Sequence, residues 1–332
     1  VTDPEGYAVY EGPAAGDTIE IEGIQPWSHA APVLYHAVLT LRDADGVLQE
    51  VVPYDIGFRR IEMINGVMCL NGERVVFNGV NRHEWNADRG RAIGADDMHA
   101  AMAVFKKNNI NAVRTCHYPD QSLWYDLCDR NGIYMIDETN LESHGSWQKL
   151  GAVEPSWNVP GSLPEWKDCV VDRARSMFER DKNHAAVLIW SCGNESYAGE
   201  DILAMSQFFH DHDPGRLVHY EGVFHCRAFD AISDMESRMY AKPWEIREYL
   251  ESHPKKPFIL CEYMHDMGNS LGGMESYVRL ADEFDQYQGG FIWDYMDQAL
   301  RHTDALGRSV LGYGGDFADR NTDYNFSGNG IV

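Results

Sequence analysis

The stretch AVLIWSCGNE, from Ala186 to Glu195, joins a short apolar run directly to a charged side chain. The stretch PFILCE, from Pro257 to Glu262, repeats this arrangement later in the chain. A carboxylate at the end of a buried strand costs free energy unless it has a partner or a function. If both runs are strands of one barrel, Glu195 and Glu262 converge on the same mouth, because all strand ends open on one face.

Short apolar runs of the same kind recur after residue 61 and alternate with helical patterns. Met98, Met102 and Phe105 have helical spacing after a predicted cap at Asp96, and similar patterns cover 166–177 and 202–209. Together these patterns predict a (β/α)₈ barrel over 61–332. No G-x-G-x-x-G motif follows a strand, which disfavours an open dinucleotide-binding sheet. The predicted strands are Val75–Val80, Ala112–Thr115, Ile133–Ile136, Ala186–Trp190, Leu217–Tyr220, Ala231–Met235, Phe258–Cys261 and Gly289–Trp293.

The first 60 residues show strand patterns and no helical pattern. Strands are predicted at Thr18–Glu22, Leu34–Leu41 and Val47–Val52, with Asp45-Gly46 as a hairpin turn before the third. We expect residues 1–60 to form a small immunoglobulin-like β-sandwich, incomplete in its early strands. A further hairpin is predicted around Asn71-Gly72, between Val67–Leu70 and Val75–Phe77. The predicted fold class is therefore α/β, a TIM barrel preceded by an all-β domain.

The composition describes an ordinary globular protein with an acidic surface. Of 332 residues, 44% are hydrophobic and 24% charged, and the net charge of −24 should repel nucleic acid and anionic membranes. No apolar stretch approaches the roughly 18 residues of a membrane span. The chain opens on Val1, so the true N-terminus and any signal peptide stay open. Four cysteines lie in or beside apolar runs and indicate buried thiols in a reducing, cytoplasmic compartment: Cys69, Cys116, Cys192 and Cys261.

Polar side chains gather where the predicted barrel strands end, and such ends supply a barrel's catalytic residues. Two glutamates there suit glycoside hydrolysis, in which one carboxyl is a proton donor and the other is ionised. Arg114 is a plausible cationic partner that keeps its neighbour charged. A carboxyl separation of ~5–5.5 Å predicts retention of configuration and ~6.5–9.5 Å predicts inversion. The gathered residues include His83, Arg114, His117, Glu138, Asn194, Glu195, Tyr240, Glu262, His265 and Trp293.

A separate metal signal lies after the third predicted strand. In extended chain, Glu142 and His144 point the same way, because one residue separates them. With a third carboxylate, this mixed set is compatible with Mg²⁺ or Mn²⁺.

The strings around these residues resemble the β-galactosidases of glycoside hydrolase family 2. The resemblance runs from about Trp27 to Val332. It includes Asn78-Gly79-Val80-Asn81-Arg82-His83-Glu84, Asn111-Ala112-Val113-Arg114, His117-Tyr118-Pro119, Leu127-Cys128-Asp129-Arg130, Gly193-Asn194-Glu195-Ser196, Cys261-Glu262-Tyr263, Met267-Gly268-Asn269-Ser270 and Gly289-Gly290-Phe291.

The resemblance implies a retaining hydrolase of terminal β-D-galactosyl residues, with Glu262 as nucleophile and Glu195 as acid/base. It further implies that Tyr240 hydrogen-bonds the nucleophile and that Arg114 has a supporting role. Mg²⁺ would be held by Glu142, His144 and Glu195, and Na⁺ partly by the Phe326 carbonyl and Asn329. The galactosyl subsite would consist of His83, His117, Asn194 and His265, with Trp293 as its apolar floor.

Three alternatives stay open at this point. β-Glucuronidases and β-mannosidases share the barrel and both glutamates, although the string from Cys261 to Ser270 favours a galactosidase. A carbohydrate-binding or scaffold fragment is the third, because family members are longer and their first domain supplies a sugar-binding Asp. We therefore expect residues 1–332 alone to be weakly active or inactive. The expected partners are a small β-galactoside, the missing N- and C-terminal domains of the same enzyme, and a further copy of the chain, since the family often forms dimers or tetramers.

Overall fold

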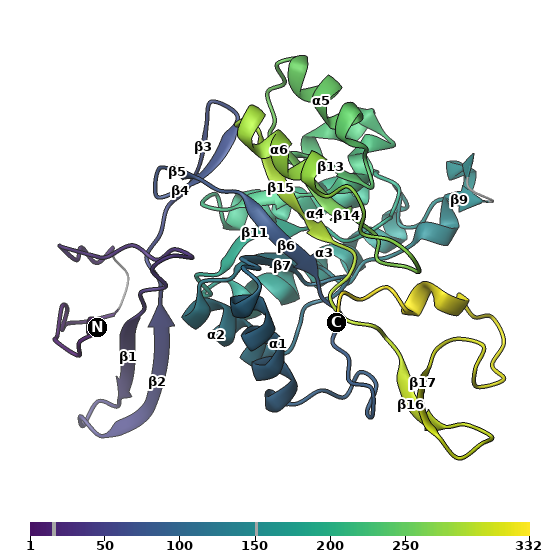
Figure 1. Ribbon diagram of the computed structural model, residues 1–332. Coiled ribbons are helices and arrows are strands. Elements are labelled where there is room, and N and C mark those ends of the chain that lie inside the picture. Colours follow the sequence, from purple (N-terminus) through teal and green to yellow (C-terminus); the bar gives the residue numbers. More distant parts are fainter. Residues whose placement is uncertain (15–17, 150–151) are drawn as a thin grey trace.

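The computed structural model describes residues 1–14, 18–149 and 152–332. Its centre is a sheet of eight parallel strands, hydrogen-bonded in the order β12-β11-β8-β7-β6-β15-β14-β13. The sheet curls into a nearly closed barrel (Figure 1). In the strand order, β12 and β13 are the two end strands. The strands are β6 Phe77–Asn81, β7 Ala112–Arg114, β8 Tyr134–Glu138, β11 Val187–Ser191, β12 Leu217–His219, β13 Glu236–Met239, β14 Phe258–Tyr263 and β15 Tyr287–Ile292.

Helices cover the outside of this barrel between most pairs of strands. Between β12 and β13 the described chain forms only the short 3₁₀ segments η3 Glu221–Phe224 and η4 Arg227–Ile232. Further 3₁₀ turns are η1 His144–Ser146, η2 Pro155–Trp157 and η5 Tyr324–Ser327. The α-helices are α1 Ala95–Lys107, α2 Ser122–Asn131, α3 Pro164–Asp181, α4 Glu200–His212, α5 Pro243–Glu251 and α6 Glu275–Glu283. None of the helices in the described residues is long and apolar enough to cross a membrane.

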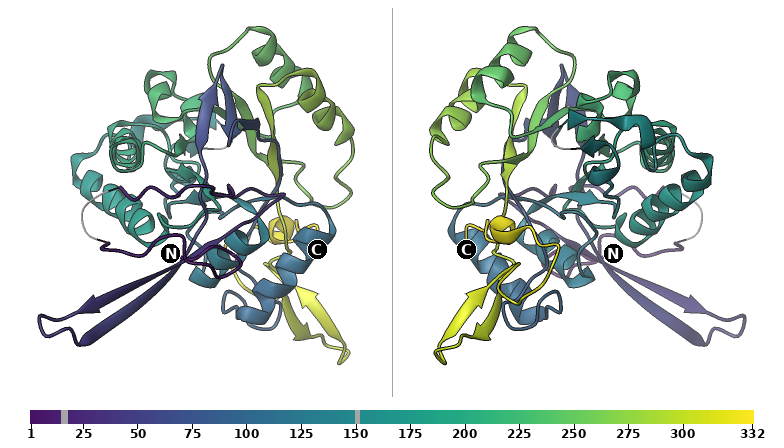
Figure 2. Two further views of the ribbon diagram at one scale, coloured as in Figure 1. Left: turned by 90° about the vertical axis from the view of Figure 1, so that its left-hand side faces the viewer. Right: turned by 90° about the vertical axis from the view of Figure 1, so that its right-hand side faces the viewer.

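Smaller antiparallel sheets flank the barrel. The N-terminal ribbon, β1 Tyr35–Arg42 paired with β2 Leu48–Ile56, projects away from the barrel (Figure 2). Apolar side chains are exposed on both of its faces, with Val38 at 59% on one and Leu41 at 58% on the other. The other small sheets are β3 Ile61–Ile64, β4 Val67–Leu70 and β5 Glu73–Arg74; β9 Gln148–Lys149 and β10 Ala152–Val153; and β16 Leu300–Thr303 and β17 Ser309–Gly312.

The predicted barrel is confirmed, while several predicted elements are wrong in detail. The apolar run Ala231–Met235 is not the sixth strand, because its first residues close η4 and the pairing with β14 begins at Glu236. Residues 18–22 form no strand. Gly94, not Asp96, caps α1, since the Asp97 carboxylate accepts from the Gly94 N–H at 2.8 Å.

The turn at Asn71-Gly72 is present, but it leads into β5 at Glu73–Arg74, and the first barrel strand begins two residues later than Val75. The described residues before 60 contain the β1–β2 ribbon and no second sheet facing it. The immunoglobulin-like sandwich and the domain boundary at residue 60 therefore stay predictions.

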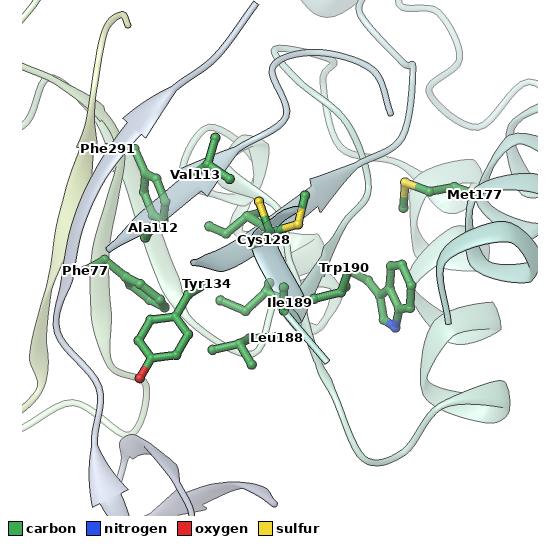
Figure 3. Close-up of a cluster of buried hydrophobic side chains, with 14 of the residues drawn as sticks. Phe77, Ala112, Val113, Cys128, Tyr134, Met177, Leu188, Ile189, Trp190 and Phe291 are labelled. Atoms are coloured by element: carbon green, nitrogen blue, oxygen red, sulfur yellow. The ribbon is translucent and has the colours of Figure 1, made fainter. Parts of the chain in front are cut away.

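The core lies inside the barrel and between its strands and helices (Figure 3). Phe77 and Phe291 meet inside with ring centroids 5.3 Å apart, and Tyr134 packs edge-on against Phe77. Trp190 points outward and stacks on Phe209 of α4. Because strands covered on both faces bury every side chain, β11 has no exposed residue, which explains its continuous apolar run. Burying each such aromatic side chain contributes about 1.5–3 kcal/mol.

Gly289 allows β15 to pack closely against β6. Substitution of this glycine tests the close packing of the two strands. Its φ is +85°, and a Cβ there would lie 2.1 Å from the carbonyl oxygen of Phe77. We expect Gly289→Ala to lower the free energy of unfolding by about 3 kcal/mol or more, measured by urea denaturation. Gly72→Ala is the matched control, because Gly72 has a φ of +87° with open space around it, and it should cost only about 1 kcal/mol. Equal losses would contradict the close approach of the two strands.

Candidate active site

The predicted site residues lie together at the C-terminal ends of the barrel strands. Glu195 follows β11 and Glu262 lies near the end of β14, and these strands are not neighbours in the sheet. The two strand ends open on the same face of the barrel, so their side chains can approach each other across the mouth. The other members are His83 after β6, Arg114 and His117 at β7, Glu142 and His144 after β8, Asn194 after β11, Tyr240 after β13, His265 after β14 and Trp293 after β15.

Arg114 connects most of these strands through one buried guanidinium. Its side chain is fully buried and donates to Glu262 Oε1 at 2.8 Å, to Asn194 Oδ1 at 2.7 Å and to Glu138 Oε2 at 2.7 Å. Burial opposes its charge, but Glu138 and other acidic neighbours raise the pKa of Arg114 above its ordinary value. The site therefore contains a permanent cation that the surrounding acids hold in place.

Glu262 has donors at both of its carboxyl oxygens. One of its oxygens accepts from Arg114, and the other accepts from the Tyr240 hydroxyl at 2.7 Å. Burial, and then the charge of Glu262, raise the pKa of Tyr240 far above its usual range, so this hydroxyl keeps its proton and remains a donor. Both oxygens of this buried carboxylate are thus held by fixed donors.

Glu195 has the opposite electrostatic surroundings. Burial, followed by the negative charges of Glu262 and Glu142, raises the pKa of Glu195 to about 8. At neutral pH the Glu195 carboxyl is therefore protonated and can donate a proton. Because the two glutamates differ in this way, one is suited to attack and the other to give its proton to a leaving group.

The backbone before Glu195 requires a glycine. Gly193 has a φ of +129°, and a Cβ there would lie 2.7 Å from the carbonyl oxygen of Leu141. This carbonyl also accepts the N–H of Asn194 at 2.8 Å, so the two loops touch through their backbones. The glycine thus allows the contact that brings Asn194 and Glu195 over the barrel mouth.

Aromatic and imidazole rings form one wall of the site. Trp293 stacks on His117 with centroids 5.2 Å apart and meets His83 edge-on at 5.5 Å. Burial lowers the pKa of both histidines to about 3, so both are neutral at physiological pH. Tyr118 and Glu138 each hold one histidine through a hydrogen bond to its Nδ1. An apolar ring beside neutral polar groups suits a ligand with a C–H face and hydroxyls.

An adjoining wall is formed by residues after β13, after β14 and in η5, since the Asp266 N–H next to His265 donates to the carbonyl oxygen of Trp293 at 2.8 Å. His265 packs against Tyr240 at 5.7 Å and against Phe326 at 5.9 Å between centroids. A cavity of about 470 Å³ opens beside Tyr240 and His265. Asn329 lies close to the Trp293 side, because its carbonyl oxygen accepts the N–H of Asp294 at 2.9 Å.

One group of three side chains and one separate amide oxygen offer ligand atoms for cations. Glu142, His144 and Glu195 each offer a ligand atom, all within 4.8 Å of one another, which matches the predicted divalent site. Within this group, His144 Nδ1 lies 3.3 Å from Glu195 Oε2. The buried Oδ1 of Asn329 has no hydrogen-bond partner in the described residues, so it is free to coordinate a small cation.

The sequence did not predict the roles of two further acidic residues of the site, Glu138 and Glu221. Glu138 was noticed at a strand end, but its role as shared acceptor for Arg114, Ser191 and His117 needed the structure. Glu221 follows β12, a strand for which no site residue was predicted from the sequence. The Glu221 carboxylate accepts the N–H of Glu195 at 2.7 Å. The strand-end rule applied to β12 would have found Glu221.

Comparison with known proteins places this geometry among carbohydrate-cleaving enzymes. A profile described as "Glycosyl hydrolases family 2, TIM barrel domain" matches residues 61–332, and one described as "Glycosyl hydrolases family 2" matches residues 3–59. A β-galactosidase of Halalkalibacterium halodurans is 63% identical over 92% of this chain and 30% of its own length. A β-galactosidase large subunit of Lactobacillus acidophilus is 58% identical over 94% of this chain and 50% of its own length. The chain thus spans between about a third and half of these relatives.

Solved structures show the same fold at low sequence identity. A β-glucuronidase from Ruminococcus gnavus, in complex with a C6-substituted uronic isofagomine, superposes with a TM-score of 0.76. It shares 21% identity and covers 92% of this chain and 58% of its own. A β-glucuronidase of Dictyoglomus thermophilum gives a TM-score of 0.73, also at 21% identity. At this identity the likeness concerns the fold alone.

The pKa of Glu195 provides a direct test of the site's electrostatics. In metal-free buffer the Glu195 carboxyl should titrate near pH 8, and Glu262→Gln should lower this pKa because a neighbouring negative charge is lost. The measurement is pH-difference infrared spectroscopy of ¹³C-glutamate-labelled protein, with Glu195→Gln as the subtracted reference. Glu248→Gln, at an exposed position on α5, should leave the pKa of Glu195 unchanged. A pKa near 4.5 in all variants would contradict the raised value.

Proposed function

Because the chain belongs to glycoside hydrolase family 2, we propose that the protein is a retaining β-galactosidase that removes terminal β-D-galactosyl residues from substrates such as lactose. Relatives named β-galactosidase at 53–63% identity support this substrate. The observation that carries the proposal is the pairing of two glutamates with opposite surroundings: Glu262 between Arg114 and Tyr240, and Glu195 with its raised pKa.

The proposed reaction is a double displacement. Glu262 attacks the anomeric carbon and forms a glycosyl ester, while the bond to the leaving oxygen breaks and that oxygen takes the proton of Glu195. The Glu195 carboxylate then removes a proton from water, and the resulting hydroxide attacks the same carbon. Galactose leaves with its configuration retained, Glu262 returns to its ionised form, and Glu195 is protonated again.

The sugar would lie against the aromatic wall of the site. Trp293 would support the C–H face of the galactosyl ring, and His83 and His117, both neutral, would hydrogen-bond its hydroxyls. Asn194 would contact the 2-hydroxyl, and His265 would line the subsite beside Trp293. A uronate would need a free positive charge, but the buried Arg114 already donates to four acceptors and these two histidines are neutral, which favours a neutral sugar over a glucuronide.

We also propose two cations at this site. Mg²⁺ would be held by Glu142, His144 and Glu195, whose ligand atoms lie close together. When bound there, it supplies positive charge that tunes the acidity of Glu195. Na⁺ would use the unpartnered Oδ1 of Asn329 together with the carbonyl of Phe326.

The partners and location proposed for the protein follow from its relatives and its thiols. Since the relatives are two to three times longer, further domains of the same enzyme would complete the site, and a homo-oligomer is proposed as well. All seven cysteines are unpaired in the structure, which supports a reducing cytoplasmic location.

A panel of 4-nitrophenyl glycosides tests the proposed activity on the full-length protein. We expect kcat/KM for the β-D-galactoside to exceed that for the β-D-glucuronide and β-D-mannoside by at least about 100-fold, because the site reads individual hydroxyls. Glu262→Gln should lower turnover of the galactoside by at least about 1,000-fold without changing the melting temperature, since the nucleophile is lost.

One control variant and one rescue experiment separate the roles of the glutamates in this panel. Glu275→Gln, on the exposed face of α6, should leave turnover unchanged. Glu195→Gly should lose activity that azide restores on activated aryl galactosides, with galactosyl azide as the product. Preference for the glucuronide, or near-normal turnover by Glu262→Gln, would refute the proposal.

Removal of the divalent cation tests the proposed metal site. Thorough chelation should lower turnover and added Mg²⁺ should restore it, because the cation contacts the proton donor. Isothermal titration should show Mg²⁺ affinity reduced by at least about 10-fold in Glu142→Gln. Glu154→Gln, an exposed carboxylate in the same connection between β8 and β11, is the matched control and should bind Mg²⁺ normally. Unchanged kinetics after chelation would argue against the site.

A further inference from the structure

The peptide backbone of Glu195 is held at both of its polar atoms by side chains from other loops. Its N–H donates to Glu221 Oε1 at 2.7 Å, and its carbonyl oxygen accepts from Trp147 Nε1 at 2.7 Å. Glu221 begins η3 after β12, and Trp147 follows η1 after β8. Two connections from either side of β11 thus grip the same residue, and we call this pair of contacts the Glu195 clamp.

The conformation that the clamp holds is unusual for a residue with a side chain. Glu195 has a φ of +39°, in the left-handed region that residues other than glycine seldom adopt. Such a conformation persists when the surrounding structure determines it, and it is concentrated at functional sites. Because the backbone angles set the direction of the Cβ, loss of the clamp would redirect the Glu195 carboxyl.

Glu221 has few other reasons to be buried. Its side chain is 5% exposed, and its second oxygen, Oε2, has no hydrogen-bond partner in the described residues. A buried carboxyl that leaves an oxygen unpaired costs free energy, and here the hydrogen bond that the carboxyl makes to another residue, among those described, is the one from the Glu195 N–H. A cavity of about 100 Å³ lined by Glu195, Glu221 and Trp147 lies beside the clamp, so the backbone has room to move if a contact is removed.

We propose that Glu221, together with Trp147, is a positioning residue that fixes the backbone of Glu195 so that its carboxyl reaches the oxygen of the leaving group. The inference rests on the proposed function, because it assigns Glu195 the role of proton donor. Glu221 acts through the Glu195 N–H and does not touch the reacting atoms.

Leaving groups that differ in their need for a proton separate positioning from a general structural role. Lactose needs its departing oxygen protonated, whereas 2,4-dinitrophenolate departs without a proton. In the full-length protein, we expect Glu221→Ala to lower kcat/KM for lactose by about 10- to 100-fold. The same variant should lower kcat/KM for 2,4-dinitrophenyl β-D-galactoside by less than about 3-fold, because that first step needs no proton.

Two further variants test the chemistry of the clamp itself. Glu221→Gln keeps an oxygen that accepts the Glu195 N–H, so it should remain within about 3-fold of wild type on both substrates. Trp147→Phe keeps an aromatic ring but removes the N–H donor, and it should lower the rate on lactose selectively.

Asp129→Ala is the matched control for a lost contact between a carboxylate and the backbone. Asp129 is buried and accepts the N–H of Ala186 at 2.7 Å, next to the opposite end of β11. This variant should lose stability while the ratio of the two kcat/KM values stays at that of wild type.

The inference is overturned if Glu221→Ala lowers both rates equally, or if Glu221→Gln impairs lactose hydrolysis as much as Glu221→Ala. Failure of the wild-type protein to hydrolyse either galactoside would overturn the proposed function itself, and the inference with it. Selective loss on lactose in Glu221→Ala, with recovery in Glu221→Gln, supports the inference.

Discussion

The burial of Arg114 is the constraint on which the rest of the site depends. Its guanidinium has no access to water, so each of its donors needs a protein acceptor, and the acceptors come from strand ends or from residues just beyond them. The acids need the cation equally, since a buried carboxylate left without its partner costs about 3–5 kcal/mol. The arginine therefore fixes Glu262, Asn194 and Glu138 relative to one another, and their positions define the mouth of the barrel.

The two glutamates at the barrel mouth, Glu262 and Glu195, differ in their chemistry because their neighbours differ. Glu262 accepts hydrogen bonds from a cation and a hydroxyl, so both of its oxygens are engaged. Glu195 faces other acids in a largely buried setting, which favours its protonated form. Neither character is a property of glutamate alone, and each depends on residues that are distant in sequence. The division of roles that we propose, between an attacking group and a proton donor, would therefore arise from packing.

The sequence predicted the barrel and most of the site because both follow local rules. Apolar runs mark buried strands, and polar residues directly after them mark the catalytic face, so the pattern alone placed Glu195 and Glu262 at the barrel mouth. The misplaced sixth strand shows the limit of this reasoning, because Ala231–Met235 is apolar enough for a strand but parallel pairing with β14 begins at Glu236. The contact between Glu221 and the Glu195 backbone joins two loops whose closeness depends on barrel closure, and no local pattern records it.

The ribbon of β1 and β2 has a consequence for anyone who prepares this segment of the protein. Two strands with apolar side chains on both faces cannot shield those side chains by themselves, and the edges, where the described residues bridge β1 at Thr2 and His36 but leave most of it open, offer a template for a neighbouring chain. Produced alone at high concentration, residues 1–332 should therefore self-associate through this arm and form turbid suspensions, even though the barrel beside it carries a large negative charge. Mild detergent, or polar replacements on the ribbon, would be the practical remedy.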